Sequence, residues 1–513
     1  MSIVKFPNVA GGLNADLSPE ELATNFWSAS SNMRFANGYA SRFRGTTAAF
    51  TTPSITPYFV IAYAVPASKF IVYAGLTAIV CDDGTTRTTI TGTAPTGAID
   101  DRWTGGVVNG VLVLNNYADI PRYWAGVPAT PFAALPGWTA THRCAVMRPF
   151  KNYLVALDIT KAGVRTPHTV KWSNTLNPGA ITAAGDWDET NPAIDAGETD
   201  IAGEDLLVDC LPLGDTNIIY KERSMWAMSY VGAPYIFRFQ RLPGDHGMLA
   251  RGCVENTPVG HVVMTPGDIV VHSGHGCTSI ANAVIRDYIF SNLSQTYYKR
   301  SFVTSNPAKN EVWICFPFGS ESATCNRAAV WNWIDKTWAI RTLDSVTYGT
   351  TGQVVYTSAA TAWSGATTTW DTQAGAWDDY DYSPAESRLV FCHSTPYISL
   401  ADIGSSDFGT VITSTLERSG MHLDSPEKVK LCRAVYPIID GTTGDTVQIE
   451  VGASMTANVA PTWSAPATFT IGNDQKVDCF ATGRYLAVRL THVNYPTWRI
   501  RSLGIDVQDQ GYF

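Results

Sequence analysis

The chain has 513 residues, of which 45% are apolar and 16% are charged, and its formal net charge is −9. This balance is too apolar for a disordered chain, and it lacks the basic excess with which proteins grip nucleic acid tightly. The 42 glycines, 28 prolines, 16 tryptophans and 22 tyrosines favour strands separated by turns over helices.

The first element expected along the chain is a helix over residues 19–31. Ser18 is placed as its N-cap, Pro19 fits the first helical position, and Glu21 completes a capping box. Leu22 and Phe26 then lie four residues apart and would share one face. The sequence shows no signal peptide and no membrane-spanning run, so synthesis in the cytosol and no membrane anchor are expected.

One local design recurs between about residues 55 and 410: a turn rich in Gly, Asn or Asp, followed by an alternating or wholly apolar run. Its instances begin at Ser68, Asn109, Asn152, Thr216, Gly267, Asn310 and Ser387. Three of the intervals are 41 or 43 residues, close to the ~40–45-residue period of a four-stranded propeller blade. Longer intervals would carry insertions near residues 176–204 and 345–382. The repeat predicts an all-β fold with a β-propeller of six to eight blades, and a run of β-sandwiches is the alternative.

The spacing of the apolar runs changes after about residue 410. Strands are expected at residues 410–416, 429–438, 446–451, 467–471, 485–491 and 498–507. About 100 residues is a common size for a β-sandwich. The predicted organisation is therefore an N-terminal platform and assembly segment of helix and strands (1–54), a propeller (55–410) and a C-terminal sandwich (411–513) that contributes to the platform.

Metal chemistry is weakly signalled. The ten cysteines are scattered with no CxxC pair, which favours free, mostly buried thiols. His272, His275 and Cys277, with His261 upstream, are possible zinc ligands, but their spacing matches no usual zinc pattern and two glycines among them favour a hairpin turn. No metal and no cofactor is predicted.

Acidic residues are concentrated between residues 186 and 209. They are Asp186, Asp188, Glu189, Asp195, Glu198, Asp200, Glu204, Asp205 and Asp209. Hard cations such as calcium prefer several carboxylates together, but the loop pattern of an EF-hand is missing. A solvated acidic loop is the preferred interpretation.

Two aromatic features permit other functions. Trp370-Asp and Trp377-Asp are spaced seven residues apart, which is compatible with a carbohydrate platform beside an acid pair at Asp378 and Asp379, or with simple aromatic packing. Three arginines interleave with aromatic residues between Arg34 and Arg44, as in a nucleic-acid patch, but partner contacts or a solvated face are the preferred reading. The sequence has no Gly-rich phosphate loop, nucleophile elbow or HExxH motif, so no enzymatic activity is predicted.

The N-terminal sequence resembles the opening of the tail nozzle proteins of short-tailed bacteriophages, also called lower tail tube or packaged-DNA stabilisation proteins. The residues that carry this resemblance are Phe6-Pro-Asn-Val-Ala-Gly-Gly-Leu-Asn, Ser18-Pro-Glu-Glu-Leu, Trp27, Asn32-Met-Arg-Phe, Asn37-Gly and Arg42-Phe-Arg-Gly. Further similar stretches are Trp172-Ser-Asn, Trp187-Asp, Ile219-Tyr-Lys-Glu, Tyr485-Leu-Ala-Val-Arg and Gly504-Ile-Asp-Val. The resemblance therefore extends over nearly the whole chain.

The resemblance implies a structural virion protein that is made in the host bacterial cytoplasm and located in the tail. It implies a hexameric ring below the portal–adaptor connector, with a β-propeller in each subunit, attached fibres or spikes, and double-stranded DNA passing non-specifically through the lumen. The ring would conduct DNA during ejection and help to retain the packaged genome. The alternative is a carbohydrate-binding or glycan-degrading propeller of the tail.

Two candidate sites follow from this interpretation. The assembly segment is expected to act through Gly11, Gly12, Leu13, Trp27, Asn32, Arg34, Arg42 and Arg44. The acidic loop is a candidate lining or gate of the lumen through Asp186, Asp188, Glu189, Asp195, Glu198, Asp200, Glu204 and Asp205. An acidic wall repels a polyanion and keeps it mobile, over a range of about 8 Å at physiological salt.

Overall fold

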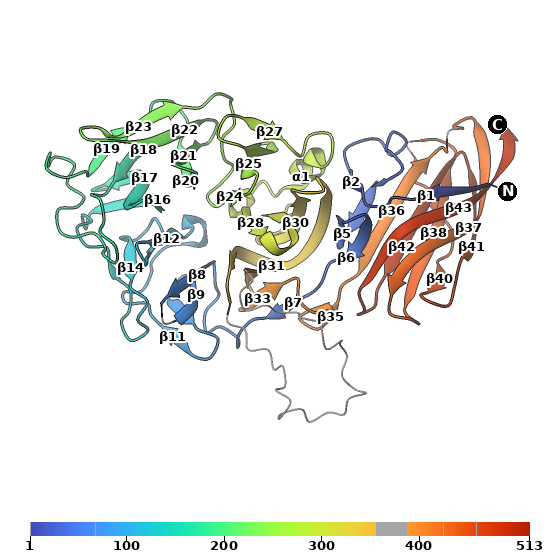
Figure 1. Cartoon of the computed structure of the whole chain (residues 1–513), viewed down its shortest axis with the longest axis horizontal. Coiled ribbons are helices and arrows are strands. Elements are labelled where there is room, and N and C mark those ends of the chain that lie inside the picture. The colour runs from blue at the N-terminus through green and yellow to red at the C-terminus, as the bar shows by residue number, and fades with distance from the viewer. Residues whose placement is uncertain (1, 67, 355–386, 424, 458, 513) are drawn as a thin grey trace.

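The computed structural model describes residues 2–66, 68–354, 387–423, 425–457 and 459–512. These residues form an all-β protein with one short α-helix, α1 (Arg286–Asn292), among them. Two bodies lie side by side, a ring of small sheets and a two-layered sandwich (Figure 1), and both chain ends lie on the sandwich. None of the helices described is long and apolar enough to cross a membrane.

Five blades of the propeller are separate four-stranded antiparallel sheets whose strands follow chain order. Blade 1 contains β8 (Phe59–Val65), β9 (Ser68–Ala74), β10 (Ile79–Asp82) and β11 (Arg87–Thr89). Blade 2 contains β12 (Thr104–Val108), β13 (Val111–Asn115), β14 (Arg122–Trp124) and β15 (Ala133–Ala134). Blade 3 contains β16 (His142–Phe150), β17 (Tyr153–Lys161), β18 (Val164–Trp172) and β19 (Gly197–Asp200).

Blades 4 and 5 continue this order. Blade 4 contains β20 (Leu207–Leu213), β21 (Thr216–Lys221), β22 (Met225–Gly232) and β23 (Ile236–Arg241). Blade 5 contains β24 (Val254–Thr257), β25 (Gly260–Thr265), β26 (Asp268–His272) and β27 (Cys277–Ser279). The first strand of each blade packs against the first strand of the next, so these strands surround the ring axis and the fourth strands form the outer rim.

Blades 6 and 7 are joined into one sheet by a long shared strand, β31 (Trp338–Gly352). Its first half pairs with β30 and its second half with β32, with register shifts around Val346. Blade 6 adds β28 (Phe302–Asn306), β29 (Glu311–Phe316) and β30 (Cys325–Asn332). Blade 7 adds β32 (Arg388–His393), β33 (Ile398–Ala401) and β7 (Thr46–Ala48), followed at the sheet edge by β34 (Ser406–Asp407) and β35 (Thr410–Val411).

The ring closes with a strand from the beginning of the chain. β7 pairs antiparallel with β33, Ser399 opposite Ala48, so the last blade combines residues about 350 positions apart in the sequence. The five separate sheets and the two halves of the shared sheet give seven blades, within the predicted range of six to eight. The predicted insertion near 176–204 corresponds to the long connection between β18 and β19, whereas most of the one near 345–382 lies outside the described residues.

The recurring motif marks the same position in most blades. Six of its seven instances coincide with the second strand of a blade, β9, β13, β17, β21, β29 and β32. The instance at Gly267 is the third strand of blade 5, whose second strand is β25. Second strands are covered by neighbours on both faces, and β13, for example, is buried throughout, which explains the wholly apolar runs.

The sandwich consists of two sheets with six strands each. The first has the order β41-β37-β43-β6-β5 with β1 paired to β43; its strands are β1 (Ser2–Phe6), β5 (Met33–Ala36), β6 (Tyr39–Arg42), β37 (Lys428–Gly441), β41 (Val477–Gly483) and β43 (Trp498–Tyr512). The second has the order β39-β38-β42-β36-β4 with β40 paired to β38; its strands are β4 (Ala29–Ser31), β36 (Ser414–Met421), β38 (Thr446–Ser454), β39 (Thr462–Trp463), β40 (Ala467–Thr470) and β42 (Tyr485–His492). The N-terminal segment therefore contributes strands to both sheets.

The helix expected over residues 19–31 is wrong. This stretch forms turns followed by β3 (Phe26–Trp27) and β4, and β3 pairs in parallel with β2 (Gly12–Leu13). Tertiary contacts outweigh the local helix signals: the guanidinium of Arg418 donates to the carbonyl oxygens of Pro19 and Leu22 at 2.6 and 2.8 Å. The residues of the predicted cap and apolar face instead form a turn that is hydrogen-bonded to Arg418 of β36.

Candidate functional site

Three of the N-terminal residues that carry the resemblance, Asn32, Arg34 and Arg42, meet where the propeller joins the sandwich. Arg34, on β5, extends its guanidinium to two carboxylates of the propeller. Its Nε and one NH₂ group donate to Glu311 of blade 6 at 2.5 and 3.0 Å, and both of its NH₂ groups donate to Asp402, just after β33, at 3.1 and 3.0 Å. The guanidinium also lies 4.5 Å from the ring centre of Phe43. We call this buried arrangement the Arg34 bridge.

The electrostatics of the Arg34 bridge are set by burial. The Glu311 and Asp402 side chains are only 1% and 6% exposed. Burial raises the pKa of Glu311, and Arg34 only partly offsets this. Burial acts in the same direction on Asp402, but the Arg34 charge outweighs it and lowers the pKa of that carboxyl. The guanidinium itself is destabilised by burial, yet the two carboxylates raise its pKa, so it stays charged.

Asn32 makes a second connection beside the first. It lies between β4 and β5 with a left-handed φ of 58°, which asparagine tolerates. Its side-chain oxygen accepts from Arg341 of β31 at 3.0 Å, and its amide donates to the carbonyl of Thr413 at 2.8 Å. Arg341 also donates to both oxygens of Asp407, at 2.7 and 2.8 Å. One asparagine thus ties the shared propeller strand to the segment that enters the sandwich.

Arg42 connects two loops through hydrogen bonds to backbone carbonyl oxygens, not to carboxylates. It is 3% exposed, and its guanidinium donates to the carbonyl oxygens of Asn494, Tyr495 and Pro496 at 2.7–2.8 Å and also to that of Ser405. Burial lowers the pKa of this guanidinium. Its Nε is buried and has no hydrogen-bond partner in the described part of the chain.

Of the remaining N-terminal candidates, Gly12, Leu13 and Trp27 are buried, Gly11 is half-buried, and the half-buried Arg44 lines a groove beside this junction. The Gly11 amide donates to the Asn25 carbonyl at 2.9 Å, and a Cβ at Gly11 would lie 2.6 Å from that oxygen, so only glycine fits. The Trp27 indole donates to the Val9 carbonyl at 2.7 Å, and Gly12 and Leu13 are buried in β2. The assembly candidates therefore mainly hold the chain's own two bodies together, and the buried ones cannot contact a neighbouring subunit directly.

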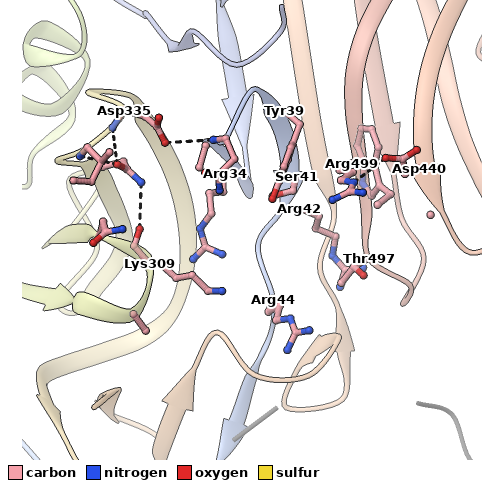
Figure 2. Close-up of a pocket in the computed structure, with 18 residues that line it drawn as sticks. Arg34, Tyr39, Ser41, Arg42, Arg44, Lys309, Asp335, Asp440, Thr497 and Arg499 are labelled. Atoms are coloured by element: carbon pink, nitrogen blue, oxygen red, sulfur yellow. Dashed lines mark hydrogen bonds and ion pairs between the residues drawn. The ribbon is translucent and has the colours of Figure 1, made fainter. Parts of the chain in front are cut away.

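A groove opens beside this junction, between blade 6 and the sandwich, with a volume of about 620 Å³ (Figure 2). Lys309 lies on its propeller wall and Arg499 on its sandwich wall. Arg499 donates to Asp440 at 2.8 Å, and its guanidinium lies 5.0 Å from the ring centre of Tyr39. Its charged lining residues are Arg34, Arg42, Arg44, Lys309, Arg499, Asp335 and Asp440. Five basic and two acidic side chains make this basic groove suited to anionic groups.

Sequence reasoning found the arginines of this junction but missed Glu311, Asp402, Arg341 and Lys309. One signal in the sequence could have found Glu311, because this acid directly precedes the wholly apolar run 312–316. A charged residue in a buried strand requires a partner of opposite charge. The identity of that partner, 277 positions away, could not be read from the sequence.

The predicted acidic loop lies at the outer rim of blade 3, between β18 and β20, at the opposite end of the molecule from the sandwich (Figure 1). We call residues 186–205 the acidic rim. β19 is the outermost strand of its blade, so the carboxylates up to Asp200 lie away from the channel of the propeller, whereas Glu204 and Asp205 precede β20, the innermost strand of blade 4. The role of this loop as a lumen gate stays a prediction.

Three of the eight carboxylates of the acidic rim are paired with lysines, and others accept hydrogen bonds from neutral side chains. Glu189 accepts from Lys171, and Glu198 accepts from Lys161 at 2.5 Å. The Asp205 carboxylate lies 3.0 Å from the Lys221 ammonium. Asp186 accepts from the Asn174 amide at 3.0 Å and Asp195 from the Tyr153 hydroxyl at 2.8 Å. Asp188, Asp200 and Glu204 are exposed and form no ion pair within the described chain.

The central channel of the propeller is bridged by side chains. Arg102, just before blade 2, donates to the carbonyl oxygens of Lys299 and Ser301, just before blade 6, at 2.6 and 3.2 Å. Arg251, just before blade 5, donates to the Asp101 carbonyl at 2.9 Å. These contacts join blades that are not neighbours, so they cross the ring axis and close the channel.

The histidines and the cysteine considered as zinc ligands belong to a hairpin and to a buried contact in the core. Residues 273–276 turn between β26 and β27, as predicted. His261 and His272 are buried, and the Tyr220 hydroxyl lies 2.8 Å from Nδ1 of His261. Burial lowers the pKa of His261 to about 4. The described residues contain no group of three or more His, Cys, Asp or Glu that could hold a metal ion.

The remaining sequence features divide between the core and the undescribed stretch. All ten cysteines are free and nine are buried, as expected. Trp370, Trp377, Asp378 and Asp379 lie outside the described residues.

No protein-family model matches the chain, and no curated protein matches it in sequence. Among solved structures, the chain is similar to the WD40 β-propeller domain of Doa1. The two share 9% sequence identity, and the comparison covers 70% of this chain and 97% of that domain with a TM-score of 0.38. The described sheets themselves, arranged as seven four-stranded blades around an axis, establish the chain as an all-β propeller protein with an attached sandwich.

Proposed function

We propose that this chain is a structural virion protein that forms the tail nozzle ring of a short-tailed phage. The observation that carries the proposal is the position of the N-terminal residues that resemble that family. Asn32, Arg34 and Arg42 join the propeller to the sandwich, and Gly11 and Trp27 order the segment beside them. A subunit that must withstand the pressure of a packaged genome benefits from two bodies fixed by buried charged contacts.

Because the propeller channel is closed, DNA would have to pass outside the propeller of each subunit. Arg102 and Arg251 cross the axis of the propeller, so a duplex cannot run through a single subunit. The conduit in this proposal is the hole enclosed by several copies, a hexamer in the resemblance, with portal–adaptor proteins above and fibres or spikes attached. An acidic surface facing that hole would let DNA slide, because each phosphate contact strengthens retention.

Negative-stain microscopy of the purified chain tests the proposal. We expect closed rings with a central hole wide enough for duplex DNA, and mass spectrometry of purified phage particles should detect the chain in a fixed ratio to the portal protein. A chain that stays monomeric at every concentration and is missing from infectious particles would contradict the proposal.

A further inference from the structure

We infer that the basic groove of one copy receives the acidic rim of the next copy, an inference that rests on the proposed ring. The groove lies between blade 6 and the sandwich, and the acidic rim belongs to blade 3. Such a contact is heterologous, joining two different surfaces head to tail, which is the type of contact that closes into a ring.

The groove offers positive charge that the chain does not use. The Lys309 ammonium, on the exposed turn before β29, has no hydrogen bond or ion pair within the described residues. On the opposite wall, Arg499 and Arg501 share the single carboxylate of Asp440, at 2.8 and 2.6 Å. The guanidinium of Arg42 beneath them is satisfied only by carbonyl oxygens. A carboxylate entering the groove would therefore meet uncompensated cations.

The acidic rim offers the complementary charge. Its eight carboxylates contact three lysines, Lys161, Lys171 and Lys221, which leaves an excess of five negative charges. Asp188, Asp200 and Glu204 are the exposed members without an ion pair in the described structure, and of these Asp188 lies in the connection before β19, on the face of the groove. The loop before β19 is also held in shape by its own contacts, such as the Asp186–Asn174 hydrogen bond, so little ordering entropy would be lost on docking.

The two surfaces are placed so that one rotation can bring them together. The acidic rim lies at the far edge of the propeller, and the groove lies on the other side of the propeller where it meets the sandwich (Figure 1). The groove and the part of the acidic rim before β19 also emerge on the same face of the propeller: strands in a blade are antiparallel, so the turns after the first and third strands leave on one side. The acidic rim includes the turn after β18, the third strand of blade 3, and the groove is lined by the turns after β28 and β30 of blade 6.

The groove fits carboxylates of a protein better than DNA. Arg34, Arg42 and Arg499 already donate to protein acceptors, and Asp335 and Asp440 lie in the lining. A duplex would require a run of free cations and would be repelled by these acids. A volume of about 620 Å³ accommodates a few side chains of a loop.

Charge reversal on each surface, alone and mixed, tests the inference. The groove variant is Lys309→Glu and the rim variant is Asp188→Lys. Each alone places like charges opposite each other, so we expect ring assembly, followed by sedimentation velocity and negative stain, to require at least about tenfold more protein. A mixture of the two should assemble within about threefold of the wild type, because the two kinds of subunit attract each other and can alternate.

Matched controls separate this contact from general charge effects. Lys5→Glu on β1 and Glu321→Lys on the opposite propeller face change exposed charges elsewhere and should leave assembly unchanged. Normal rings from both reversed variants, or a mixture that fails to recover, would overturn the inference but leave the proposed function standing. Normal rings that release DNA more slowly when Asp188 is reversed would place the acidic rim in the lumen instead. A wild-type chain that forms no rings would remove both proposals.

Discussion

The Arg34 bridge and the acidic rim both rely on ion pairs, yet they differ in reach and in exposure. The Arg34 bridge joins residues 277 and 368 positions apart, and its carboxylates are 1% and 6% exposed. At the acidic rim, Lys161 and Glu198 are 37 positions apart, on two strands of one blade, and 30% and 25% exposed.

The difference in exposure determines how much each set of ion pairs can contribute to stability. Removing one partner of a buried ion pair leaves an uncompensated charge, whereas an exposed pair is screened by water and salt. The Arg34 bridge therefore fixes how the propeller sits on the sandwich. The pairs of the acidic rim contribute little to stability and leave its remaining charges available for contact with other molecules.

The largest effect is expected from Arg34→Met. It leaves Glu311 and Asp402 buried without a cation and should cost about 4–5 kcal/mol of unfolding free energy, measured by urea denaturation. Arg489→Met is the matched control, since Arg489 also lies between two carboxylates, Glu417 and Glu450, but is 30% exposed. We expect the control to lose at most about 1 kcal/mol. Equal losses in the two variants would mean that burial does not distinguish these bridges.

An intermediate effect is expected at the buried pair of Arg148 and Asp209, whose Nε–Oδ1 distance is 2.9 Å. Burial alone would raise the pKa of Asp209, but Arg148 and two backbone amides outweigh burial and hold that pKa below its ordinary value. A lowered carboxyl pKa stabilises the fold above about pH 4, and this contribution is lost as the pH falls through the folded-state pKa.

Asp209→Asn tests this sign. We expect the variant to be about 3 kcal/mol less stable than the wild type at pH 7. The difference in unfolding free energy between the two proteins should shrink as the pH is lowered below about 4. Urea denaturation at several pH values between about 2.5 and 7 measures it. A gap that stays constant with pH would show that the effect is due to packing and not to the charge of Asp209.

The smallest effect is expected from Lys161→Met at the acidic rim. It removes the 2.5 Å contact with Glu198, but Lys171 remains close to that carboxylate, at 3.4 Å. A loss of at most about 1 kcal/mol is expected, and raising the salt concentration should reduce it further. A loss comparable to that of Arg34→Met would show that the acidic rim is a structural element of the fold.

The strand repeat was predictable because it is a local property. A buried second strand must be apolar along its length, and it must be bounded by turns, so its signature recurs wherever a blade begins. Gly267 shows the limit of this reasoning, because the third strand of blade 5 is as apolar as the second and shifts the apparent phase of the repeat. Blade 7 shows another limit, since its fourth strand, β7, comes from the beginning of the chain and pairs with β33 only when the ring closes.

The N-terminal segment could not be predicted correctly from local signals. Ser18, Pro19 and Glu21 have the spacing of a capped helix, but a helix there would forgo the contacts that Arg418 makes with Pro19 and Leu22. The strands β1, β4 and β6 find partners hundreds of residues later, in the sandwich. The division at residue 54 therefore separates segments that fold together.

The sequence by itself determined the β class, the blade repeat, the C-terminal strands and the identity of the arginines that matter, because these follow from the periodicity and the chemistry of neighbouring residues. Only the tertiary structure decided which acids meet those arginines, that the propeller channel is closed, and that a basic groove forms between propeller and sandwich while the acidic rim lies at the far edge of the propeller. Such pairings depend on how distant segments pack, and the free energy of packing is not encoded in any local stretch of the chain.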